Sequence, residues 1–434
     1  MRRTIVNEGA VHLRYEIREI VALAHEIAAL GKPITWETIG DPVQKGERAP
    51  QWILETVHEA IDDPASWAYV HSLGAPATRE FLAAKVNDRQ GGVRIGADDI
   101  LFFNGTADAM DVVYGLLRED ARILVPAPAY ITHRSLEAAH APGEQPTYLL
   151  DPTNGWLPDM DEIRSQCRRN HAIVGILVLS PDNPTGSVVP REVLEQIAEV
   201  AREFGLFLIS DEIYAHIVFG GRPRLHLSEW IGDVPGLAMR GISKEYPWPG
   251  ARCGWMEVLN RGKDPVFAEY VAAIEAAKQL EVSATVLPQM TIPKVFGDPR
   301  YEAHLTAREG MFERRADEVV AAFAGCESVI VNKPSGAFFF TVVFKPGVVD
   351  EGQTLPIEDA AIRAHVGQRA SGVPCDKRFV YYLMGATGIV VVPLGGFGCR
   401  HDGFRATLLE MNDDRRAWTF KTLRESIDRY VSGT

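Results

Sequence analysis

Short apolar runs alternate with amphipathic stretches through the first part of the chain. Between two of these runs, residues 191–205 repeat their apolar positions at the spacing of a helix. Strands that alternate with helices are typical of a mainly parallel sheet with helices on its faces. The pattern therefore predicts an α/β unit. We expect its buried strands at residues 100–103, 122–125, 172–180, 206–210, 237–243 and 253–259.

The pattern changes from about residue 310 onward and predicts a smaller α+β domain at 310–434. A long helical stretch is followed there by the apolar run 336–344, more helix, two short apolar segments and a final helix near 417–431. The amphipathic stretch 14–31 predicts a helix in the N-terminal segment, residues 1–48, and we expect it to pack on the smaller domain. Residues 49–309 form the expected large domain.

Composition and charge exclude several classes of partner. The net charge of −13 would repel nucleic acid and anionic lipid alike. The five cysteines are odd in number, scattered and never arranged as C-x-x-C, so neither a metal site nor a disulfide framework is indicated. No apolar run approaches the ~18 residues of a membrane span, and no apolar core of signal length follows the first residues. We expect a cytoplasmic protein without a membrane partner.

Short segments with polar residues come just after five of the predicted strands. Ligands of open α/β sheets bind outside the carboxyl ends of the strands, so the loops that carry these residues should converge on one crevice. The residues are Asn104-Gly105-Thr106, Pro128-Ala129-Tyr130, Asn183-Pro184, Asp211 and Ser243-Lys244.

Lys244 and Arg252 place two cations in one turn stiffened by prolines. A buried lysine loses solvation, its pKa falls, and a neutral amine becomes available to react with an aldehyde. The alternative is a lysine that extends from a loop into solvent, and Arg252 alone is equally compatible with the surface. Together with Ser243, however, the two cations would suit an aldehyde cofactor that bears a phosphate.

Asp211 ends an apolar stretch, where a lone carboxylate is costly unless a cation meets it. One interpretation is an N-cap for a helix beginning at Glu212. The other is a partner for a protonated pyridine nitrogen, with the Tyr214 hydroxyl turned toward the same ring.

Three further positions have a structural as well as a functional interpretation. Asn183 lies in a sequence typical of a turn, yet its side chain is a suitable donor to a phenolic oxygen. Gly105 and Thr106 form a strand-to-helix junction, where free amides attract phosphate. Tyr130 is compatible with an aromatic core residue or with a ring stacked on a cofactor.

Taken together, these motifs resemble those of the pyridoxal-phosphate enzymes of the aspartate aminotransferase superfamily, fold type I, class I/II. The likeness extends from residues 37–42 to residues 403–410, and its motifs occur in the order of that family. The resemblance implies an α/β fold and pyridoxal 5'-phosphate as cofactor. The shared motifs are Gly105-Thr106, Tyr130, Asn183-Pro184-x-Gly186, Asp211-x-x-Tyr214, Ser243-Lys244 and Arg252.

The resemblance also implies a role for each of these residues. Lys244 is similar to the lysine that forms a Schiff base with the cofactor and moves the substrate α-proton. Asp211 resembles the partner of the ring nitrogen, and Asn183 with Tyr214 the donors to the ring oxygen. Tyr130 resembles the ring that stacks on the cofactor. The residues that resemble the phosphate site are Gly105, Thr106, Ala107, Ser243 and Arg252.

The resemblance further implies a homodimer with shared active sites and a clamp for the substrate carboxylate. Tyr69 is similar to a tyrosine that reaches the phosphate of the neighbouring subunit. Gly40, Asn183 and Arg405 resemble the carboxylate site. Arg400 is a nearby competitor, but Arg405 belongs to an apolar strand pattern and is preferred.

The implied activity is transfer of an amino group between an α-amino acid and a 2-keto acid. The same cofactor also supports β-elimination, decarboxylation or oxidative deamination, and the fold does not decide between them. A cofactor-sensing transcription regulator of this fold would need a DNA-binding module, but the acidic chain offers a single helix before Gly40. The pocket for the substrate side chain stays open, because Trp36, Tyr246 and Trp248 suit either a lining or a packing role.

Overall fold

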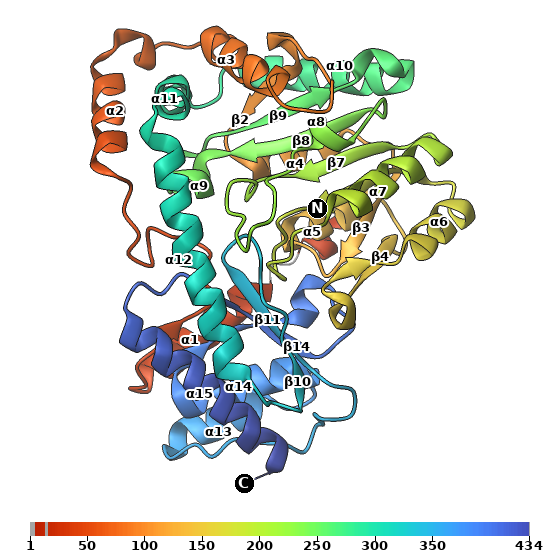
Figure 1. Cartoon of the computed structure of the whole chain (residues 1–434). Coiled ribbons are helices and arrows are strands. Elements are labelled where there is room, and N and C mark those ends of the chain that lie inside the picture. The colour runs from red at the N-terminus through yellow and green to blue at the C-terminus, as the bar shows by residue number, and fades with distance from the viewer. Residues whose placement is uncertain (1–4, 14–15, 434) are drawn as a thin grey trace.

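The computed structural model describes residues 5–13 and 16–433. Its larger sheet has eight strands in the order β2-β9-β8-β7-β6-β3-β4-β5 (Figure 1). The inner pairs β3–β6, β6–β7 and β7–β8 are parallel, as is β3–β4, whereas β2, β9 and β5 pair antiparallel. The strands are β2 (Ile100–Phe103), β3 (Arg122–Ala127), β4 (Thr147–Asp151), β5 (Leu157–Pro158), β6 (Ile173–Leu179), β7 (Phe207–Asp211), β8 (Gly236–Gly241) and β9 (Gly254–Leu259).

Helices flank this sheet, which confirms the expected α/β class. Helix α7 follows the expectation closely and buries one apolar face, including Leu194 and Ile197. The helices between residues 51 and 297 are α2 (Gln51–Asp62), α3 (Pro76–Asn87), α4 (Thr106–Gly115), α5 (Ile131–His140), α6 (Met160–Arg169), α7 (Arg191–Phe204), α8 (Leu227–Trp230), α9 (Ile242–Glu245), α10 (Pro265–Glu281) and α11 (Val286–Gly297).

A smaller antiparallel sheet, in the order β10-β11-β14-β13, lies at the other end of the molecule (Figure 1). Its strands are β10 (Val329–Ile330), β11 (Phe339–Phe344), β13 (Val392–Pro393) and β14 (Gly403–Thr407). Ile20, Leu23 and Ile27 of α1 share a hydrophobic core with this sheet. The surrounding helices are α1 (Glu16–Ala29), α13 (Ala360–Arg369), α14 (Cys375–Thr387) and α15 (Asp413–Ser432).

Two connections join the parts of the chain. The short parallel pair β1 (Thr35–Trp36) and β12 (Ile389–Val390) ties the N-terminal segment to the C-terminal part. Helix α12 (Arg300–Phe323) runs without interruption from the larger sheet to the smaller one (Figure 1). Because α12 passes through residue 310, the division of the chain near that residue stays a prediction. Within the described residues, no helix is long and apolar enough to cross a membrane.

The strand register brings the expected functional loops together. Leu179 at the end of β6 lies opposite Asp211 at the end of β7, and Asp211 lies opposite Met239 of β8. The chain leaves β6 toward Asn183 and leaves β8 toward Lys244. Three parallel strands thus deliver their polar residues to one edge of the sheet.

Candidate active site

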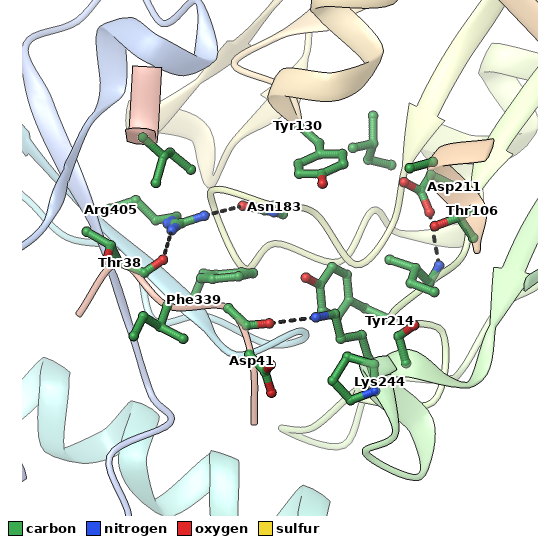
Figure 2. A pocket seen from close by; sticks show the side chains of 18 of the residues that line it. Thr38, Asp41, Thr106, Tyr130, Asn183, Asp211, Tyr214, Lys244, Phe339 and Arg405 are labelled. Atoms are coloured by element: carbon green, nitrogen blue, oxygen red, sulfur yellow. Dashed lines mark hydrogen bonds between the residues drawn. The ribbon is translucent and has the colours of Figure 1, made fainter. Parts of the chain in front are cut away.

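A cavity of about 420 Å³ lies at this edge of the larger sheet (Figure 2). Strands of both sheets, the N-terminal segment and α1 all contribute to its wall. The lining residues that the sequence singled out are Gly40, Thr106, Ala107, Tyr130, Asn183, Asp211, Tyr214, Ser243, Lys244, Arg252 and Arg405. Three apolar residues of the wall, Ile17, Val21 and Ile39, were not singled out from the sequence, because an apolar side chain by itself does not indicate chemistry.

Lys244 lies on α9, a single helical turn directly after β8. Its Nζ donates a hydrogen bond to Gly40 O over 2.6 Å. Burial, with the charges of Arg252, Arg405 and Arg308, lowers the pKa of Lys244 to about 8 against the opposing effect of Asp41. A substantial fraction of the amine is therefore neutral near physiological pH.

One end of the cavity is suited to an anion. Gly105 has φ of 93° and caps α4, whose first residue is Thr106. Arg252 packs against this glycine, and a Cβ added to Gly105 would lie 2.4 Å from Arg252 Nη2. The guanidinium donates to Pro249 O over 3.0 Å and to Asn104 O over 3.4 Å. Helix amides, a guanidinium and the nearby Ser243 hydroxyl thus surround the same space.

Asp211 is buried at the end of β7, with 3% of its surface exposed. Its Oδ1 accepts from the amide of Ile213 over 3.1 Å, and the chain forms a turn there instead of the helix that the N-cap alternative required. His133 Nε2 lies 3.2 Å from Oδ2, and His133 Nδ1 lies 3.0 Å from Tyr114 Oη. The sequence did not predict this chain of contacts, because nothing in it indicates that His133 and Asp211, 78 positions apart, lie together.

Arg405 occupies the opposite end of the cavity on β14 and is 2% exposed. Its Nη1 donates to Asn183 Oδ1 over 3.1 Å and its Nη2 to Thr38 O over 2.7 Å (Figure 2). The guanidinium carbon lies 4.3 Å from the centre of the Phe339 ring. Arg400, by contrast, is exposed and is not among the lining residues.

The aromatic residues divide into two groups. Tyr130 and Tyr214 line the cavity, and the Tyr214 ring packs edge-on against Phe338. Tyr69 lies outside the cavity with 84% of its surface exposed. The residues left open by the sequence, Trp36, Tyr246 and Trp248, are not among the lining residues either.

Residues 38–418 match the model of the family described as aminotransferase class I and II. The chain belongs to this family. The resemblance that the motifs indicated, to fold type I enzymes of the class, is thereby confirmed. The aminotransferase assignment also favours amino-group transfer over elimination, decarboxylation or oxidative deamination.

Relatives support the same assignment for this aminotransferase. An uncharacterised aminotransferase of Methanocaldococcus jannaschii is 46% identical over 431 residues, which cover 99% of this chain and 100% of the relative. The glutamate-pyruvate aminotransferase AlaA of Escherichia coli is 29% identical over 331 residues, 75% of this chain and 79% of the relative. The solved alanine aminotransferase of Pyrococcus furiosus has a TM-score of 0.82 at 25% identity, covering 98% of this chain and 100% of that one.

Proposed function

We propose that this aminotransferase moves an amino group between an α-amino acid and a 2-keto acid with pyridoxal 5'-phosphate attached to Lys244. The observation that carries the proposal is the position of the Lys244 amine. It is largely buried in the cavity, its pKa is lowered to about 8, and it lies between an anion site at Arg252 and a second cation, Arg405.

The residues of the cavity fit this cofactor in chemistry and in shape. Arg252, Ser243 and the amides at Thr106 and Ala107 would hold the phosphate, with Gly105 leaving room for the guanidinium. The carboxylate of Asp211 would face the ring nitrogen. Asn183 and Tyr214 would donate to the ring oxygen, and Tyr130 would stack on the ring.

The bound cofactor supplies an aldehyde carbon and a cationic ring that withdraws electrons from the substrate α-carbon. Lys244 Nζ would hold the cofactor through its aldehyde and, when free, would accept the proton from the substrate α-carbon and return it to the former aldehyde carbon on the other side of the substrate nitrogen. Arg405 and Asn183 hold the substrate carboxylate, which fixes the direction of the bond to hydrogen. Asp211 would stabilise a proton on the ring nitrogen, and His133, 3.2 Å from Asp211 Oδ2, would fix the orientation of that carboxylate.

Borohydride reduction of the purified enzyme followed by peptide mapping tests the attachment. We expect the pyridoxyl mass on Lys244 and loss of the visible absorption band. Recovery of the label on another lysine, or no label at all, would contradict the proposal.

We infer from the cavity wall that the substrate of one half-reaction has a short, uncharged side chain. Ile17, Val21 and Ile39 supply apolar surface, and the nearby Asp41 would repel a distal carboxylate. The names of relatives that act on alanine or pyruvate agree with this. Single-turnover rates with alanine and aspartate test it, and a faster reaction with aspartate would contradict it.

We also propose a homodimer in which Tyr69 reaches the phosphate of the neighbouring subunit. Tyr69 and Trp67 are 84% and 78% exposed, and Leu280 close by in the fold is 87% exposed. The hydrogen bond from Val70 N to Ser283 Oγ, 3.4 Å long, joins the two segments that carry these side chains. Analytical ultracentrifugation measures the oligomeric state. A fully active monomer would contradict an active site shared between two subunits.

The location and the domain division are proposals as well. All five cysteines lie in the described part of the chain and are free, which supports a reducing compartment such as the cytoplasm. The sequence divides into an N-terminal segment at 1–48, a large domain at 49–309 and a small domain at 310–434.

A further inference from the structure

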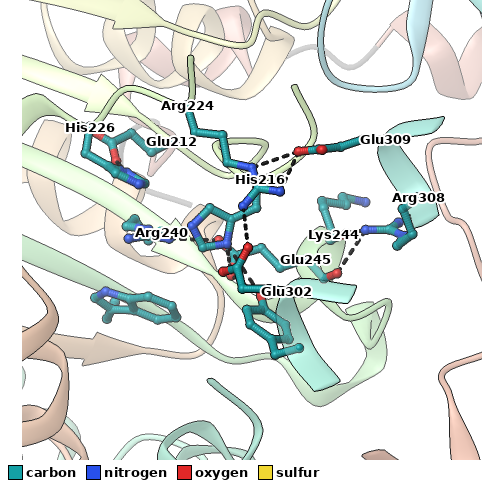
Figure 3. Close-up of polar contacts among 12 residues, drawn as sticks. Glu212, His216, Arg224, His226, Arg240, Lys244, Glu245, Glu302, Arg308 and Glu309 are labelled. Atoms are coloured by element: carbon teal, nitrogen blue, oxygen red, sulfur yellow. Dashed lines mark hydrogen bonds and ion pairs between the residues drawn. The ribbon is translucent and has the colours of Figure 1, made fainter. Parts of the chain in front are cut away.

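The α9 turn that carries Lys244 is held from behind by buried charges (Figure 3). Glu245, the next residue, is fully buried. Its carboxylate accepts from Arg240 Nη2 over 2.9 Å and from Tyr301 Oη over 3.1 Å, and His216 Nδ1 lies 3.3 Å away. Burial alone would raise the pKa of Glu245, but His216 and Arg240 outweigh it and hold the pKa well below its usual range. The side chain of Glu245 is therefore anchored as a carboxylate.

A second contact acts on the backbone of the same turn. Arg308 of α12 donates from Nη1 to Lys244 O over 2.7 Å and to Glu245 O over 2.9 Å (Figure 3). Its Nε and Nη2 donate to the two carboxylate oxygens of Glu47 over 2.6 and 3.2 Å. Arg308 and Glu47 are 5% and 7% exposed, so the pair is shielded from solvent.

These contacts answer a specific need of a short helix. The last carbonyl groups of a helix have no partner within it, and α9 spans only Ile242–Glu245. Arg308 supplies donors to two of these carbonyls at once, which the planar guanidinium allows. The backbone of Lys244 is thus fixed although the turn is too short to fix itself.

The N-terminal segment is linked to both the side chain and the main chain of Lys244. Gly40 O accepts from its Nζ, and Glu47 reaches its carbonyl through Arg308. The segment itself is closed between these points, since Glu47 N donates to Pro42 O over 2.9 Å. The wall of the cavity and the support of the reactive lysine are therefore one connected unit.

We propose that Arg308, oriented by Glu47, is a positioning residue for Lys244. It fixes the main chain of Lys244 while Nζ moves between its attachment point and the substrate α-carbon. Its charge also disfavours the protonated amine. The inference rests on the proposed role of Lys244 and adds a residue that touches neither substrate nor cofactor.

The decisive variant is the double substitution Arg308→Gln with Glu47→Gln, which removes both charges and leaves no buried ion unpaired. Arg308→Lys is the conservative partner, because it keeps the charge but cannot bridge two carbonyls and a carboxylate. Arg315→Gln is the matched control. Arg315 lies seven residues further along α12, is 4% exposed and donates to Leu408 O.

Two readouts separate positioning from simple stability. The first is the pH midpoint for acylation of Lys244 in the full-length protein freed of cofactor. The second is the split between kcat and KM in the loaded enzyme. In the double variant we expect a higher midpoint, and kcat lower by roughly 10- to 100-fold with KM nearly unchanged. In Arg308→Lys we expect the wild-type midpoint and a reduced kcat, and in Arg315→Gln no change in either.

The proposal is overturned if the folded double variant keeps both the midpoint and kcat within about twofold of wild type, or if Arg315→Gln lowers kcat equally. Should the double variant not fold, Arg308→Lys decides, and an unchanged kcat there overturns the proposal. Failure of the underlying function is a separate result, because it would show as wild-type protein that traps no pyridoxyl group on Lys244.

Discussion

Lys244 and Glu245 are neighbours in the chain but belong to opposite environments. On the pocket side, cations donate to backbone carbonyls, as Lys244 does to Gly40 O and Arg252 to Pro249 O. On the back of the same turn, cations meet carboxylates, as Arg240 meets Glu245. The charge behind the turn is thus neutralised within the protein, whereas the pocket keeps a positive potential for anionic ligands.

This difference assigns separate tasks to the two sides. A buried ion pair with complete hydrogen bonding holds one geometry, and removal of a partner is costly. A buried amine whose only hydrogen-bond partner is a carbonyl binds its proton less tightly. A reactive lysine requires this lower proton affinity, because its neutral form is the nucleophile. The comparison predicts that substitutions on the pocket side change chemistry directly, whereas loss of the Glu245 carboxylate behind the turn mainly changes stability.

The largest effect is expected for Lys244→Ala. Without the amine, neither cofactor attachment nor α-proton transfer by this residue is possible, so turnover should fall by about 10⁴-fold or more. Steady-state rates with a saturating amino donor measure it. Lys421→Ala, which alters a lysine with a 75% exposed side chain, is the control and should keep wild-type rates. Appreciable turnover in Lys244→Ala would remove the residue from its role.

Asp211→Ala should come next, with the rate of proton transfer lower by roughly 10²- to 10³-fold. The reason is that a ring nitrogen without its carboxylate partner loses its proton and withdraws electrons poorly. Stopped-flow absorbance of a single turnover measures this step, and equilibrium dialysis shows how much cofactor stays bound. A near-wild-type rate in the loaded variant would exclude Asp211 from this role.

The pocket side was largely predictable from the sequence. Apolar runs end shortly before Asn183 and directly before Asp211 and Lys244, and parallel strands bring such ends together. Even the choice of Arg405 over Arg400 followed from the apolar alternation of a strand, and the geometry places Arg405 in the cavity wall. Local pattern and topology were sufficient here.

The back of the turn was not predictable. Nothing local in the sequence indicates that the carboxylate of Glu245 turns inward to Arg240. Arg308 and Glu47 are 261 positions apart, and each has the appearance of an ordinary charged residue in sequence. The strand β4 was missed for a different reason. Its residues alternate between buried and partly exposed, so its sequence has no long apolar run like those of the neighbouring strands. Pairings between distant segments carry no signal in a single sequence.

Glu245→Gln tests the back of the turn through stability. It leaves the buried charge of Arg240 without its shorter carboxylate contact, so the free energy of unfolding should fall by about 3 to 5 kcal/mol. Denaturant titration of the cofactor-free protein measures it. Glu425→Gln, from an exposed pair with Lys421, should cost less than about 1 kcal/mol. Equal losses in both variants would refute the contrast between the two environments.

Arg405→Lys tests the far end of the pocket with a smaller expected effect. Lysine cannot reproduce the planar fork that would meet a carboxylate, so binding of amino acids should weaken by roughly 10- to 100-fold while binding of simple amines changes little. Spectral titration with an amino acid and its decarboxylated amine compares the two. Arg400→Lys is the matched control, because Arg400 is exposed outside the cavity. A greater loss in the control would reverse the assignment.

The smallest expected effect concerns the pH dependence of Lys244 itself. Its pKa is lowered to about 8 by burial and neighbouring cations, so in the cofactor-free protein the amine loses its proton at lower pH than an ordinary lysine. The neutral fraction, and with it the rate of acylation by a small reagent, should rise roughly fivefold between pH 7 and 8 and level off above about pH 9. Exposed lysines should instead continue to gain about tenfold per pH unit up to their usual range near 10.4. Competitive labelling with mass spectrometry reads all lysines in one sample, so the others serve as internal references. A Lys244 profile that continues to rise with theirs would mean that the pocket does not favour the neutral amine, and the difference between the two sides of the turn would then lie in geometry alone.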